Sequence, residues 1–84
     1  MNKGDLMATK LKVDPRFWDD QEWGFQHYGE LVDKYRNQWV AIVGQQVVSH
    51  GYDLSQVEEE ASKKTGRARD QIPLMYIEAG NQIF

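Results

Sequence analysis

The sequence of 84 residues contains no cysteine, and this absence excludes several kinds of chemistry. Disulfide bonds, a nucleophilic thiolate and zinc or iron–sulfur sites with cysteine ligands all require that residue. No apolar run approaches the roughly 20 residues of a membrane span, and the first residues lack the apolar stretch of a signal peptide. We therefore expect a cytoplasmic protein with no contact to a membrane.

An excess of positive charge is also absent. The chain has 10 Lys and Arg against 13 Asp and Glu, which gives a net charge of −3 and argues against nucleic acid as a partner. A chain of this length forms one domain with a modest core, burying about 60–65% of its unfolded surface. Small domains without disulfides or metals often gain stability by association. We expect a protein partner, either a second copy or a larger complex.

The clearest structural pattern is a β-hairpin. Two runs of β-branched and aromatic residues, 39–43 and 47–48, flank Gly44 and Gln45. A glycine at the first central position accepts the positive φ of a type II′ turn, so a two-residue turn of this type is predicted.

That turn sets the register of the hairpin, with Ile42 opposite Val47 and Trp39 opposite His50. One face of the hairpin then carries Trp39, Ala41, Val43, Val48 and His50, and the other carries Val40, Ile42 and Val47. Because both faces are apolar, we expect another element to cover each of them.

A helix and a third strand follow the hairpin. Asp53 is a good N-cap, Gln56 completes a capping box, and Gly66 is the expected end of the helix. Residues 73–77 form a third strand with proline at its leading edge, which we place beside the first strand. The predicted fold is α+β, with an N-terminal helical segment before a ββαβ core.

The chain divides into four segments. We expect a flexible or partner-ordered arm (1–13), an aromatic-rich helical segment (14–37), the ββαβ core (38–79) and a C-terminal tail (80–84). Asp14 followed by Pro15 is a strong helix start. Gly24 and Gly29 each weaken a continuous helix by roughly 1 kcal/mol, so a break or kink between two short helices is predicted.

Five large aromatic residues lie close together in the helical segment: Phe17, Trp18, Trp23, Phe25 and Tyr28. They could cover the second face of the sheet as core residues, or bind a partner, since Trp, Tyr and Phe dominate binding hot spots. They alternate with acidic residues rather than with cations, which argues against a single-stranded nucleic-acid platform. We expect them to be the principal partner-binding residues, with Tyr28 shared with the core.

No catalytic or metal-binding motif is present. The two histidines, His27 and His50, lack the spacing and the added carboxylate of a metal site. Asp19, Asp20 and Glu22 are neighbours at a helix start, whereas acid–base catalysis needs opposed carboxylates in a pocket. We therefore expect no metal, no cofactor and no enzymatic activity, although the chain could be an accessory subunit of an enzyme complex.

The only basic cluster lies in residues 63–69, with four cations in seven positions. It is typical of a helix C-terminus followed by a solvated loop, but it could also contact phosphates or an acidic partner. Two functional hypotheses result. The first is a non-catalytic protein-interaction module, as an accessory subunit or assembly factor of a larger complex. The alternative is a small regulatory, antitoxin-like protein that binds a neighbouring gene product or nucleic acid.

The hairpin and the helix start also carry a resemblance. Tyr35 and Arg36, the run 38–43, the run 47–49, Gly51 and the pair Asp53–Leu54 resemble a family of small microbial proteins of unknown function. That family has a K-Y-x-x-x-W-V-A-V … V-V-A-S-G-x-x-L core, and the resemblance covers roughly residues 28–79. It implies a compact strand–strand–helix–strand fold and transfers no catalytic residue.

Overall fold

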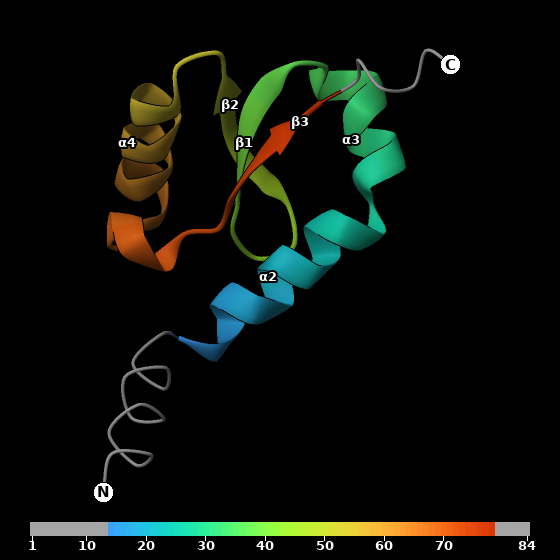
Figure 1. The fold of residues 1–84 in the computed structure, drawn as a ribbon. Coiled ribbons are helices and arrows are strands. Elements are labelled where there is room, and N and C mark those ends of the chain that lie inside the picture. Colours follow the sequence, from blue (N-terminus) through green and yellow to red (C-terminus); the bar gives the residue numbers. More distant parts are fainter. Residues whose placement is uncertain (1–13, 79–84) are drawn as a thin grey trace, which may run out of the picture.

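A computed structural model describes residues 14–78 and confirms the α+β fold. The elements, in chain order, are α2 (Pro15–Gln26), α3 (Tyr28–Tyr35), β1 (Gln38–Ile42), β2 (Val47–Gly51), α4 (Leu54–Thr65), the 3-10 helix η1 (Arg69–Gln71) and β3 (Leu74–Ile77) (Figure 1). The expected arm at 1–13 and the expected tail at 80–84 lie outside the described residues. In the part that is described, no helix is long and apolar enough to cross a membrane.

The three strands form one antiparallel sheet in the order β2-β1-β3. The third strand therefore lies beside the first, as predicted. Helix α4 packs on one face of the sheet, and α2 with α3 packs on the other (Figure 1). The prediction that both apolar faces are covered is thus confirmed.

Two core clusters lie on the two faces of β1. The cluster under α2 and α3 consists of Leu31, Val32, Val40, Ile42 and Ile77. The cluster under α4 consists of Ala41, Val57, Ala61 and Ile72. Consecutive residues of β1 alternate between the clusters because successive side chains of a strand point to opposite faces.

The start of α2 and both ends of α4 lie where the capping residues predict them. Asp14 accepts a hydrogen bond from the Arg16 N–H at the start of α2, and Asp53 accepts from the Ser55 and Gln56 N–H groups at the start of α4. Gly66 ends α4 with a φ of 76°, a conformation that glycine adopts without steric cost.

The predicted turn type of the hairpin is wrong. Gly44 has a φ of 69° and Gln45 a φ of 59°. Positive φ at both central residues is the pattern of a type I′ turn, whereas type II′ has it only at the first. The sequence favours the simpler assignment because glutamine rarely adopts a positive φ.

The predicted register holds only next to the turn. The observed pairs are Trp39–Gly51, Val40–His50, Ala41–Ser49 and Ile42–Val47. Val48 is an extra residue, a β-bulge, so the predicted pair of Trp39 with His50 is wrong. The bulge turns Ser49 toward α4, where its buried hydroxyl donates to the Val57 carbonyl at 2.7 Å. It also moves His50 to the opposite face, beside Tyr35.

The predicted helix break is present, but it lies at His27 rather than at a glycine. Gly24 is buried within α2. A Cβ at this position would lie 2.7 Å from Ile42 Cδ1 and 2.9 Å from Met75 Cε. The lack of a Cβ at Gly24 therefore lets α2 pack closely on the sheet, and this glycine does not produce the change of direction.

Candidate functional site

Helix α2 presents two aromatic residues to solvent. Trp18 is 51% exposed and Phe25 is 61% exposed. Because an α-helix turns through about 100° per residue, positions seven apart differ by only about 20°. Trp18 and Phe25 therefore lie in line on one side of α2, and we call this pair the outer stripe.

Acidic residues border the outer stripe on one side. Asp19 and Glu22 are exposed, and the helical period places both within about 100° of Trp18. Gln26 donates from Nε2 to a Glu22 carboxylate oxygen at 3.2 Å. We call Asp19 and Glu22 the acidic rim. The surface thus combines two large apolar side chains with negative charge along one border.

The other aromatic residues of this segment turn inward. Trp23 packs against the core cluster and stacks on His27, with ring centroids 4.4 Å apart. Tyr28 packs against the same cluster, and its hydroxyl lies 2.9 Å from the Glu78 amide nitrogen and 3.2 Å from the Glu78 carbonyl oxygen. Phe17 is half-buried and meets Trp18 edge-on at 4.9 Å. Of the five expected partner-binding residues, only Trp18 and Phe25 are therefore largely exposed.

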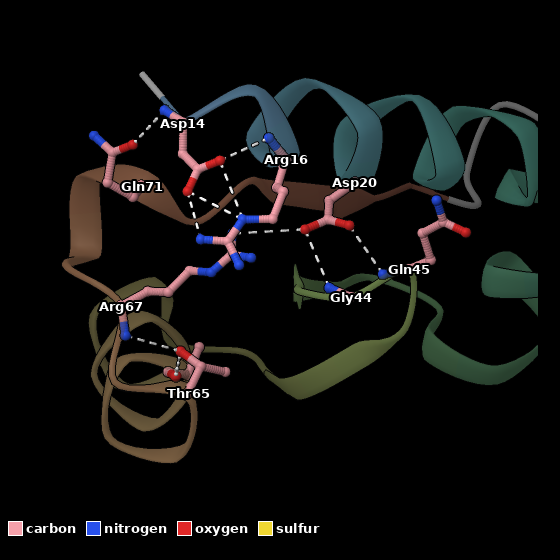
Figure 2. Close-up of polar contacts among 9 residues, drawn as sticks. Asp14, Arg16, Asp20, Gly44, Gln45, Thr65, Arg67 and Gln71 are labelled. Carbon is pink, nitrogen blue, oxygen red and sulfur yellow. Dashed lines mark hydrogen bonds and ion pairs between the residues drawn. The ribbon is translucent and has the colours of Figure 1, made fainter. Parts of the chain in front are cut away.

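A buried carboxylate holds α2 against the hairpin turn. Asp20 is 2% exposed. Its two oxygens accept the Gly44 N–H at 3.1 Å and the Gln45 N–H at 2.9 Å (Figure 2). These bonds satisfy two backbone donors that the type I′ turn leaves unpaired. We call this arrangement, a buried carboxylate that accepts two backbone N–H groups, the Asp20 clamp.

A third segment joins the Asp20 clamp. Arg67, in the loop after α4, lies 3.7 Å from the Asp20 carboxylate, and its side chain is only 14% exposed. Its buried Nη1 has no hydrogen-bond partner among the described residues. The Asp14 N–H donates to Gln71 Oε1 at 2.9 Å, which ties the start of α2 to η1 (Figure 2). Helix α2 is thus fixed along its length.

The N-cap of α2 is also an ion pair. Hydrogen bonds from the Arg16 side chain, and then from its backbone, lower the pKa of Asp14 from 3.8 to about 2. The same contact raises the pKa of Arg16. Arg16 is exposed, and together with Asp20 and Arg67 it lines a hollow of about 230 Å³. Because Asp20 already uses its oxygens on backbone and Arg67, this hollow is best explained as part of the packing of α2.

The histidines do not form a metal site. His27 stacks on Trp23, while His50 Nδ1 lies 2.9 Å from Gln38 Oε1. Within residues 14–78 no group of three metal-ligating side chains comes together. A second hollow of about 370 Å³ lies between β2 and α4, lined by both charge signs: His50, Gly51, Asp53, Gln56, Val57, Glu59, Glu60 and Lys63.

The cations of residues 63–69 contact acidic or carbonyl oxygens. Lys63 pairs with Glu59 at 3.4 Å, and Lys64 Nζ donates to the Val48 carbonyl at 2.9 Å. Arg69 lies 3.9 Å from Glu58 and 3.8 Å from Glu59. Acidic residues of α4 thus border the basic cluster, which lowers its local positive charge.

The Asp20 clamp was not predicted from the sequence. Its partners come from the hairpin turn and from the loop after α4, and neither is close to Asp20 along the chain. One feature could have indicated it: the helical period places Asp20 on the same side of α2 as Trp23 and Gly24. An acid on the inner side of a helix requires a partner.

Comparisons with known proteins identify a family and give no activity. Neither the curated proteins nor the solved structures contain a significant match to this chain. A family described as a family of unknown function, DUF5678, matches residues 30–77, which span α3 from its first turn, the hairpin, α4 and β3. Helix α2 and the outer stripe precede the matched region. Since the match covers more than half of the chain, this protein belongs to the DUF5678 family.

Proposed function

We propose that this protein is a non-catalytic protein-interaction module that binds its partner through the outer stripe of α2. The observation that carries the proposal is the exposure of Trp18 and Phe25, 51% and 61%, on one side of a single helix. Exposed large apolar side chains that gather in one place mark interaction surfaces, and Trp is among the residues most enriched in binding hot spots. The module would serve as an accessory subunit or assembly factor of a larger complex.

The geometry fits a helix that lies in a groove. Such helices bind through apolar anchors at positions i, i+3, i+4 and i+7. Trp18 and Phe25 occupy the two ends of this pattern, and the polar Gln21 and Glu22 occupy its middle positions. The acidic rim of Asp19 and Glu22 lies along one border. A complementary partner therefore has an apolar groove with Lys or Arg on one side, because complementary charge at a rim directs association.

The Asp20 clamp supports binding by fixing the helix in advance. A binding element that is already ordered loses less conformational entropy when it binds. Hydrogen bonds from Gly44 and Gln45 to Asp20, and the ion pair with Arg67, hold α2 on the sheet with its outer stripe turned to solvent. The matched family region then serves as the scaffold of the binding helix.

The alternative of a small regulatory, antitoxin-like protein receives less support. It would use the cations of residues 63–69 to bind nucleic acid or an acidic protein. Lys63 and Arg69 already pair with Glu58 or Glu59, and these acids would repel phosphates. We therefore place the interaction module first.

The experiment is affinity purification of the tagged full chain from cells that express it naturally. Trp18→Ser combined with Phe25→Ser should remove a stoichiometric partner while the melting temperature stays unchanged. Tyr52→Ser is the matched control, since Tyr52 is 77% exposed on a different part of the surface; this variant should keep the partner. Asp19→Asn with Glu22→Gln should weaken binding and reduce its dependence on salt. A partner that the variant with Trp18→Ser and Phe25→Ser retains as well as the Tyr52→Ser control does would overturn the proposal.

A further inference from the structure

The outer edge of β3 has unpaired backbone groups in the described part of the chain. The Ile42 N–H donates to the Pro73 carbonyl at 3.1 Å, and Val40 lies opposite Met75. Residue pairs of an antiparallel ladder alternate between hydrogen-bonded and non-bonded. Leu74 and Tyr76 therefore direct their N–H and C=O groups away from β1, and no described residue bonds to them.

Both ends of this edge are closed. Pro73 precedes β3 and has no N–H group, while the Tyr28 hydroxyl bonds both backbone groups of Glu78. The opposite edge of the sheet has a different protection, because Lys64 Nζ donates to the Val48 carbonyl of β2. A lysine placed at a strand edge is a common device against pairing with another chain. Between its two closed ends, β3 has no such device.

The side chains of β3 are uncharged and apolar on both faces. Tyr76 is 42% exposed, and its ring lies 5.2 Å from the half-buried ring of Trp39. Met75 is half-buried on the opposite face, against the core cluster of α2 and α3. Helix α4 packs over β2 and β1, which leaves the Trp39–Tyr76 pair at the border of the covered area. An open edge of this kind is a template for another strand.

We propose that two copies of this chain pair through β3, in antiparallel orientation about a two-fold axis at Met75. Leu74 then lies opposite Tyr76 of the second copy, and each residue donates its N–H to the other's C=O. The contact is the same from both sides, as a two-fold interface requires. Tyr76 packs on Leu74 of the second copy, and Met75 packs on Met75.

The second copy is the occupant that fits because the strand is complementary to itself. Residues 74–77 carry no charge, so self-pairing brings no like charges together. The outward N–H and C=O groups of Leu74 and Tyr76 lie on either side of Met75. In the antiparallel pair, those of Leu74 can therefore bond to those of Tyr76 in the second copy. The result is a continuous sheet across two domains, with Trp39 and Tyr76 of both copies covered between the two α4 helices. This interface is separate from the outer stripe of α2.

The test measures the mass of the purified full chain by sedimentation over a series of micromolar concentrations. Wild type should form a dimer. Tyr76→Pro removes one outward N–H without touching a bond to β1, so it should be a monomer. Tyr76→Thr keeps the N–H and loses the ring, so its dimer should persist with a higher dissociation constant. Trp18→Ser with Phe25→Ser should remain a dimer.

Amide hydrogen exchange tests the same interface in the wild-type protein, so it does not require any variant to fold. In wild type, protection of the Leu74 and Tyr76 amides should rise with protein concentration. A monomeric wild type, a dimer that Tyr76→Pro leaves intact, or protection that is independent of concentration would each overturn the proposal. A dimer lost only in the Trp18 and Phe25 variant would assign self-association to α2 instead.

Discussion

The carboxylate of Asp20 lies 3.7 Å from the guanidinium of Arg67, and this ion pair joins α2 to the loop that follows α4. The same carboxylate accepts two N–H groups from the hairpin turn. Three segments that are distant in sequence therefore meet at one buried charge. Their meeting fixes the rotation of α2 about its own axis, and this rotation decides that Trp23 faces the core while Trp18 and Phe25 face solvent.

Removal of the Asp20 carboxylate should destabilise the domain strongly. Asp20→Ala leaves the Gly44 and Gln45 amides without their acceptor and the buried Arg67 guanidinium without its counter-charge. Loss of one partner of a buried pair costs roughly 3–5 kcal/mol. Urea unfolding measures this change in the free energy of unfolding. Asp19→Ala, at the exposed neighbouring position, should change it by less than about 0.5 kcal/mol. Equal stability of the two variants would contradict the assigned role of Asp20.

The two glycines of the helical segment should respond to alanine with opposite signs. At Gly29 a Cβ meets nothing within 4 Å, so Gly29→Ala should stabilise the protein by about 0.4–1 kcal/mol. At Gly24 a Cβ meets the fully buried Ile42 at 2.7 Å. Overpacking costs about 1–3 kcal/mol, which outweighs the helical preference of alanine. Thermal unfolding of both variants is the measurement, and a stabilised Gly24→Ala would show that α2 can move away from the sheet.

The hairpin turn provides a second pair of opposite effects. Gly44 and Gln45 both have positive φ, which costs a residue other than glycine roughly 1–2 kcal/mol. Gly44→Ala should lower the free energy of unfolding by about 1–2 kcal/mol, and the melting temperature should fall accordingly. Gln45→Gly should raise it slightly, because relief of the strain exceeds the added chain entropy of about 0.5–1 kcal/mol. The second result separates a type I′ turn from the type II′ turn, in which Gln45→Gly gives no relief.

The N-cap of α2 should make a defined contribution to acid stability. The pKa of Asp14 is lowered from 3.8 to about 2, first by the hydrogen bonds from Arg16. The folded state therefore binds this proton less readily than the unfolded state. The stabilisation from Asp14 is complete above about pH 4 and is lost as the pH falls toward 2.

Asp14→Asn retains a capping side chain and does not titrate. Between pH 5 and 2, the melting temperature of this variant should fall less steeply than that of wild type. Parallel melting curves for the two proteins across this range would show that the pair of Asp14 and Arg16 is absent in solution.

Most elements of this fold could be predicted because local sequence specifies them. Asp53 and Gly66 define α4 through the cap chemistry of its two ends, and the apolar run of β1 defines the central strand on both of its faces. The bulge at Val48 could not be predicted, because it depends on the contact of Ser49 with a carbonyl of α4. The turn type could not be predicted for a similar reason, since Asp20 binds the two turn amides from another element.

The candidate site was predictable as a set of residues but not as a surface. The sequence shows that five aromatic residues are close together, and the helical period aligns Trp18 with Phe25. It does not show which side of α2 meets the sheet. That choice depends on the close approach at Gly24 and on the distant partners of Asp20, so Trp23 could not be assigned to the core beforehand.

Site-specific photo-crosslinking in living cells tests the central proposal, binding of a partner by the outer stripe, most directly. A photoreactive phenylalanine analogue replaces Phe25 in one full-length chain and Tyr52 in another, both at highly exposed positions. We expect one discrete adduct between position 25 and a different protein, lost when Trp18→Ser is added, and no such adduct from position 52. No adduct at position 25, the same adduct from both positions, or an adduct that persists with Trp18→Ser would contradict the account.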